Sequence, residues 1–151
     1  MSGLKYLTVQ DVHWVNLHVT GSPQDFNYAD LEEVTFYQYG YGGSTDLLAQ
    51  AARFVSGFLK KRPFESGNEG TAFISVLAFL RANGYEPAFE SSFDWFKNLE
   101  NGTYEPGEAI SHHFRKMVDH HGLVEIRSAI EVALAEEAAS LAQLGTTSTP
   151  T

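Results

Sequence analysis

The feature that most constrains the fold is the run Thr71-Ala-Phe-Ile-Ser-Val-Leu-Ala-Phe-Leu-Arg-Ala-Asn83, which is apolar almost all round. Its one charged residue, Arg81, stands near the end. A helix without a polar face must be surrounded by protein, because any exposed side would place apolar surface in water. Asn83-Gly84 is a typical helix end. The sequence therefore predicts an all-α domain, a helical bundle built around this segment as its buried central helix.

Other segments show apolar residues at helical spacing and pack around this centre in our interpretation. Helices are predicted over 7–19, 46–61, 91–99, 108–118 and 124–144, with a weaker, short one over 25–34. Thr8 followed by Asp11 has the spacing of a capping box, and Thr45 is expected to cap the helix that follows it.

The sequence predicts that the C-terminal part is an addition to the main domain. Residues 1–122 form one domain, and 123–144 add a helix with a narrow apolar stripe. That stripe either packs on the domain or pairs with a partner, such as a second copy in a homodimer. Residues 145–151 are polar and are expected to form a flexible tail.

The segment Thr35-Phe-Tyr-Gln-Tyr-Gly-Tyr-Gly-Gly43 combines aromatic and β-branched residues with glycines, which predicts an extended or hairpin-like conformation. One interpretation is a loop whose rings pack on the core. The other is a flap that grips a partner protein by strand addition. The flap residues would be Phe36, Tyr37, Tyr39 and Tyr41.

Composition narrows the function classes. The chain has no cysteine, so disulfides and thiolate metal sites are excluded, and a cytoplasmic location is expected. A formal net charge of −9 argues against direct nucleic-acid binding. The first residues lack the apolar run of a signal peptide, and no segment has the length of a membrane span, so no membrane contact is expected.

The stretch between the helix ending near Lys61 and the central helix predicts an anion-binding loop. Pro63 stops the first helix, and Gly67 permits a positive φ or a close approach to a ligand. The free N–H groups and the dipole of the next helix favour anions. The predicted cradle consists of Phe64, Ser66, Gly67, Asn68, Glu69, Gly70 and Thr71.

Histidine pairs suggest a weaker alternative. His113 and either His120 or His121 lie seven or eight residues apart, which is one helical face if the helix continues that far. Two ligands do not make a metal site, so a third residue such as Asp119 would be needed. The simpler interpretation is a surface helix with histidines that bind nothing.

The cradle and its flanking helices resemble the Fic/Doc family, and the death-on-curing branch in particular. The family motif reads H-x-F-x-(D or E)-(G or A)-N-(K or G)-R, and this chain has R-P-F-E-S-G-N-E-G-T over 62–71. The resemblance spans about residues 4–120 and includes the opening helix and the helix after the motif. It implies a helical bundle, transfer of AMP or phosphate from ATP with Mg²⁺, and a toxin–antitoxin setting.

The departures from the motif fall on its chemistry. Arg62 stands where the family has its base, and an arginine cannot accept a proton near neutral pH. Ser66 replaces the Mg²⁺-binding acid, and a hydroxyl is a poor sole ligand for that ion. Gly70 replaces the phosphate-clamping arginine, and Glu69 repels phosphate. Glu65 is acidic but lies one residue away from the metal position.

We therefore expect a Doc-like protein that lacks nucleotidyl or phosphoryl transfer, needs no cofactor, and acts by binding an antitoxin-like or target protein. The first alternative is an active transferase that uses ATP and Mg²⁺ with a base supplied by His112 or His113. The second is a metal-binding protein that uses the histidine pairs.

Overall fold

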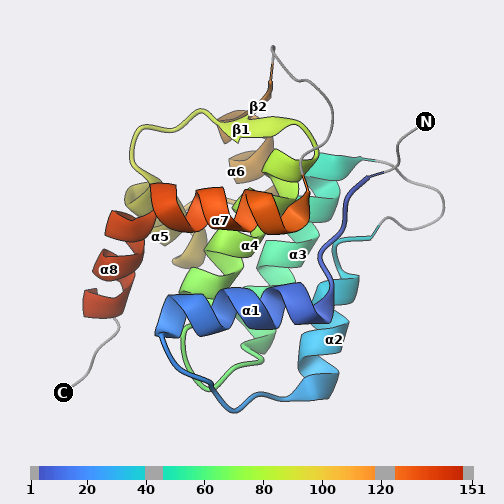
Figure 1. Cartoon of the computed structure of the whole chain (residues 1–151). Coiled ribbons are helices and arrows are strands. Elements are labelled where there is room, and N and C mark those ends of the chain that lie inside the picture. Colours follow the sequence, from blue (N-terminus) through green and yellow to red (C-terminus); the bar gives the residue numbers. More distant parts are fainter. Residues whose placement is uncertain (1–3, 40–45, 118–124, 148–151) are drawn as a thin grey trace.

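The computed structural model of the chain describes residues 4–39, 46–117 and 125–147. Figure 1 shows that these residues form an all-α fold with one small sheet. The helices are α1 (Val9–Thr20), α2 (Tyr28–Phe36), α3 (Leu47–Lys61), α4 (Asn68–Ala82), α5 (Ser92–Glu100), α6 (Pro106–His113), α7 (Ile126–Glu136) and α8 (Ala138–Thr147), and β1 (Tyr85–Pro87) pairs antiparallel with β2 (Phe114–Lys116).

The predicted central helix is α4. Every residue of α4 is buried except Glu69 and Arg81. Figure 1 shows α1 and α7 lying side by side across α4, with α3 beside it. The helix begins at Asn68, three residues before the apolar run, so its first turn belongs to the cradle. The predicted all-α class and the buried centre are both confirmed.

Helix α1 is held by a cap at its start and by contacts with α7 along one side. Thr8 and Asp11 form the predicted capping box, each side chain accepting from the other residue's backbone N–H. The Asp11 carboxylate also accepts from Nε of Arg127 in α7 at 2.8 Å, and the Arg127 guanidinium lies 4.4 Å from the centre of the Trp14 ring. These contacts join α1 to α7 over the central helix.

The prediction for 35–43 is wrong in its described part. Residues 35 and 36 close α2, and 37–39 form a turn rather than an extended segment. The cause is the fully buried Gln38, whose amide accepts from the N–H of Leu7 and donates to the carbonyls of Leu7 and Thr35. These tertiary bonds outweigh the β propensity of the aromatic residues. Tyr41 lies outside the described residues.

The cap of α3 also differs from the prediction. The side chain of Asp46 accepts from the N–H of Ala49 and makes the N-cap, one residue later than expected. Thr45 lies outside the described residues. Boundary shifts of this size are common because several polar residues in a row can serve as a cap.

Two C-terminal predictions are wrong in their extent. The helix predicted to reach 118 ends at His113, because Phe114 is extended and begins β2. Phe114 is buried edge-on against the rings of Phe89 and Trp95, which fixes it in the core. The helix predicted over 124–144 is interrupted at Glu137, where α8 turns to contact α5 and α4.

The apolar stripe of the C-terminal segment belongs to the core. Ile126, Ala129, Ile130 and Ala133 are buried, and α7 packs against α4 and α1. Of the two interpretations of this stripe, the structure therefore favours packing on the domain over pairing with a second copy. In the described part of the chain, no helix combines the length and apolar character needed to cross a bilayer.

Candidate functional site

The candidate site is the loop of residues 62–67 that joins α3 to the start of α4. Arg62 ends α3 in the left-handed conformation, with φ 47° and its N–H bonded to the Phe58 carbonyl. Gly67 is also left-handed, with φ 77°, and serves as the N-cap of α4 without a side-chain bond. A left-handed residue therefore stands at each end of the loop.

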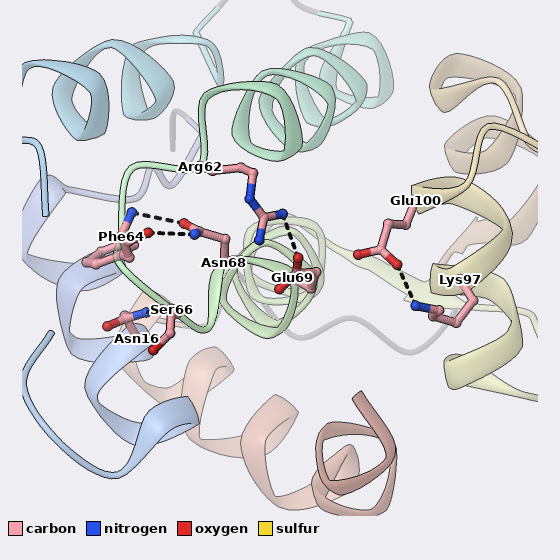
Figure 2. Close-up of polar contacts among 8 residues, drawn as sticks. All are labelled: Asn16, Arg62, Phe64, Ser66, Asn68, Glu69, Lys97 and Glu100. Atoms are coloured by element: carbon pink, nitrogen blue, oxygen red, sulfur yellow. Dashed lines mark hydrogen bonds and ion pairs between the residues drawn. The ribbon is translucent and has the colours of Figure 1, made fainter. Parts of the chain in front are cut away.

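Asn68 holds the loop from inside. Its Oδ1 accepts from the N–H of Phe64 at 3.0 Å, and its Nδ2 donates to the carbonyl of the same residue at 2.7 Å. Figure 2 shows the Asn68 side chain pointing back at Phe64 rather than outward. Asn68 is only 1% exposed, and Phe64 is buried too. Both residues therefore shape the loop, and neither lines the cavity next to it.

The loop is also tied to the segment between α1 and α2. Phe26 and Phe64 form an isolated antiparallel bridge, with hydrogen bonds from Asn27 N–H to Pro63 O and from Glu65 N–H to Asp25 O, both 2.8 Å. These bonds satisfy backbone groups that a free loop would leave to water. The loop is thus a fixed part of the fold.

Asn16 of α1 supports the loop from the other side. Its Nδ2 lies 3.0 Å from the Ser66 carbonyl and 3.1 Å from Oγ1 of Thr71, and the side chain is buried. Asn16 is not among the site residues predicted from the sequence. The signal was present, because Asn16 is a polar residue one turn from Val12 and Val19 on a face that is otherwise apolar.

The remaining cradle side chains have partners within the chain. Ser66 Oγ donates to Oε1 of Gln24 at 2.7 Å. A guanidinium nitrogen of Arg62 lies 2.5 Å from the Glu69 carboxylate, and Figure 2 shows Arg62 reaching from the end of α3 to Glu69 in the first turn of α4. Lys97, the other cation drawn there, pairs with Glu100 in its own helix at 2.6 Å.

Gly70 lies at a close contact between helices. A Cβ at this position would be 2.8 Å from Cγ1 of Val19 and 3.1 Å from Cδ2 of Leu141. Neither distance leaves room for a longer side chain without movement of these neighbours. The position that the motif resemblance assigns to a phosphate-binding arginine is therefore occupied by packing between α1, α4 and α8.

A cavity of about 300 Å³ remains outside the loop, at the lower end of the range for ligand sites. Its lining residues are Val19, Thr20, Gln24, Ser66, Gly67, Glu69, Gly70, Leu141 and Leu144. Among these, Glu69 is the one acid, and it is already paired with Arg62. Magnesium is usually bound through one or two carboxylates together with water and substrate phosphates, and Glu69 is the one carboxylate that this lining offers among the described residues.

The left-handed conformation of Arg62 at the end of α3 can be tested by substitution. Replacing Arg62 by glycine or by alanine removes the same ion pair, which is worth at most about 1 kcal/mol at this exposure. Glycine also relieves the left-handed strain. We expect Arg62→Gly to be more stable than Arg62→Ala by about 1 kcal/mol in urea denaturation. Equal stabilities would contradict the left-handed helix end.

His112 and His113 lie away from the cavity at the cradle. His113 stacks on Tyr104 with ring centres 5.1 Å apart, and its Nδ1 bonds to the Ala109 carbonyl. Neither His112 nor His113 lines the cavity at the cradle. Because α6 ends at His113, the predicted helical face shared with His120 and His121 is wrong, and those two residues lie outside the described ranges.

The described residues contain no group of three or more histidine, aspartate or glutamate side chains that could hold a metal ion. The predicted third ligand, Asp119, lies outside the ranges that the structure describes.

The described flap residues separate into two kinds. Phe36 and Tyr39 are exposed, whereas Tyr37 is half-buried with its ring directly over Gly57 of α3. The Tyr37 hydroxyl donates to Glu33, and this bond, with Lys61 nearby, lowers the pKa of the Glu33 carboxyl. Tyr37 therefore fastens α2 to α3.

Comparisons of the chain with protein-family models, curated proteins and solved structures find no match.

Proposed function

We propose that this chain is a Doc-like protein that does not transfer AMP or phosphate and that acts by binding another protein. The observation that carries the proposal is the bonding of the motif side chains. Arg62, Ser66 and Glu69 each have a partner within the chain, and Gly70 is closed in by Val19 and Leu141. A site prepared for phosphate transfer would direct cations and a base into the cavity instead.

The electrostatics of the cavity support the same conclusion. Glu69 stands in the first turn of α4, where a negative charge interacts favourably with the helix dipole. The carboxylate therefore takes the place that a phosphate group would occupy in an anion cradle. Arg62 balances its charge, so the cavity presents little net attraction for a nucleotide.

Loss of the base alone is worth about 10²–10⁴ in rate for a general-base mechanism. Here the base, the metal ligand and the clamp are replaced together, in the register that the resemblance assigns. The alternative of an active enzyme with an imported base has no supporting geometry, because His112 and His113 do not line the cavity. A partner protein, antitoxin-like or a target, accounts better for a loop that keeps its internal hydrogen bonds while the catalytic residues of the motif are replaced.

Calorimetric titration with ATP, in the presence and absence of Mg²⁺, tests this proposal. We expect the heats to be the same in both conditions and to show no saturable Mg²⁺-dependent binding. Titration with Mg²⁺ alone serves as the control for ion binding to the acidic surface. Tight ATP binding that requires Mg²⁺ would contradict the proposal and would favour the active-transferase alternative.

A further inference from the structure

Exposed aromatic side chains gather along α2. Among the described residues, five large hydrophobic side chains are exposed, and four of them lie on α2 or beside its ends. We call these four the aromatic strip: Phe26, Tyr28, Phe36 and Tyr39. Phe36 is the most exposed, at 64%. The fifth, Val132, lies on α7 and provides a control position.

The aromatic strip borders two neighbouring cavities. One cavity of about 330 Å³ is lined by Leu7, Phe36 and Tyr39 among others, and a second of about 470 Å³ by Phe26, Tyr28 and Leu31 among others. Both are lined by Thr8 and Val9, so they lie next to each other at the start of α1. We call the combined feature the α1–α2 groove. Clustered exposed apolar surface of this kind marks binding sites.

Among the described residues, Glu32 is the one acidic side chain that lines the groove, and His13, which lines the second cavity, is its one histidine. Glu32 is exposed, and it lies one helical turn from both Tyr28 and Phe36. In the described part of the chain Glu32 has no ion pair, and no lysine or arginine lines either cavity. A complementary ligand therefore carries a cation between apolar side chains.

The geometry favours a helix as the ligand. Because residues 28–36 are helical, their backbone groups are bonded within α2, so strand addition has no free edge here. An amphipathic helix needs only a groove with apolar walls. A second copy of the chain fits poorly, since a two-fold contact would pair the groove with its own copy, which adds another glutamate and, among the described residues, no lysine or arginine in a protein with net charge −9.

We propose that the α1–α2 groove binds a basic amphipathic helix of a partner protein. The apolar side chains of that helix cover the aromatic strip, and its lysine or arginine pairs with Glu32. This inference rests on the proposed function, namely that the chain acts by binding. The groove also contacts the loop at the candidate site, because Phe26 bridges to Phe64 and the two rings are 5.7 Å apart.

A labelled leucine–lysine peptide about four helical turns long is the probe, with its leucine–glutamate counterpart as the reference. Fluorescence anisotropy with the full chain measures both affinities. We expect the lysine peptide to bind and the glutamate peptide to bind far more weakly. Phe36→Ser and Tyr28→Ser should each weaken the lysine peptide about tenfold, whereas Val132→Ser should leave it unchanged. These positions are exposed, so the fold is retained and circular dichroism verifies it.

Charge reversal gives the second arm. Glu32→Lys should weaken the lysine peptide and strengthen the glutamate peptide more than Glu131→Lys, an exposed change of the same size on α7. If the lysine peptide does not bind, or if Val132→Ser and Phe36→Ser lose the same affinity for it, the proposal that the groove binds a basic helix is wrong. If that result came together with no Mg²⁺-dependent ATP binding, the proposal that the site is inactive would still hold. Mg²⁺-dependent ATP binding would instead contradict only the proposal that the site is inactive, and the peptide result would still decide the groove.

Discussion

Replacing Asn68 by alanine is expected to lower the free energy of unfolding by about 2–5 kcal/mol. The Asn68 amide bonds both backbone groups of Phe64 in a buried setting, and alanine leaves the N–H and the carbonyl without that partner. Each unsatisfied buried group costs about 1–3 kcal/mol, and the small cavity adds to the loss. Urea denaturation followed by far-UV circular dichroism measures the change.

The matched control for this variant is Asn27→Ala. Asn27 caps α2 by accepting from Asp30 N–H, but it is exposed, so water replaces its bond. We expect a loss of about 1 kcal/mol for this control. If Asn68→Ala costs no more than Asn27→Ala, the loop does not depend on Asn68, and a role for this side chain in the cavity becomes the better explanation.

Replacing Gly67 by alanine is expected to cost about 2–4 kcal/mol, for two reasons that can be separated. Gly67 has φ 77°, where any side chain is strained. A Cβ there would also collide with Cγ2 of Thr20 and lie 3.2 Å from Nδ2 of Asn16. Because Asn16 supports Ser66 and Thr71, the collision disturbs the whole loop.

Gly21 is the control that separates the conformational strain from the steric collision. It has φ 81° at the end of α1, and a Cβ there would meet nothing within 4 Å. Gly21→Ala should therefore cost only the conformational strain, about 1–2 kcal/mol. Thermal or urea denaturation of both variants provides the comparison. Equal destabilisation would mean that the close approach of Thr20 to Gly67 has no energetic weight.

The sequence was sufficient for the features that depend on local pattern. An apolar run without a polar face identified α4 as the centre, and the spacing of Thr8 and Asp11 identified the start of α1. These signals are local because each depends on residues within a few turns of the same helix. The same reasoning placed the loop between α3 and α4 correctly.

The sequence was insufficient where contacts are distant. The aromatic residues near 36 suggested an extended segment, but the buried Gln38 bonds to Leu7, thirty-one residues away, and forces a turn. Phe114 left the helix because its ring packs on Phe89 and Trp95. Such contacts leave little trace in a single sequence, since neither partner predicts the other.

The candidate site shows the same division. The resemblance selected residues 62–71, but it did not reveal which of them face the cavity. Phe64 and Asn68 are buried and hold the loop, whereas Ser66 and Glu69 line the cavity. Asn16 and Leu141 complete the site from α1 and α8, and no motif in the loop indicates either of them.

Transfer of label from radiolabelled ATP to protein in a lysate, with Mg²⁺ present, tests most directly whether the chain is inactive as a transferase. We expect no labelled product beyond that of a lysate without the chain. Labelling that requires the chain and disappears in Arg62→Ala or Glu65→Ala, two exposed changes that retain the fold, would contradict it. That result would mean that the loop of residues 62–67 still performs chemistry.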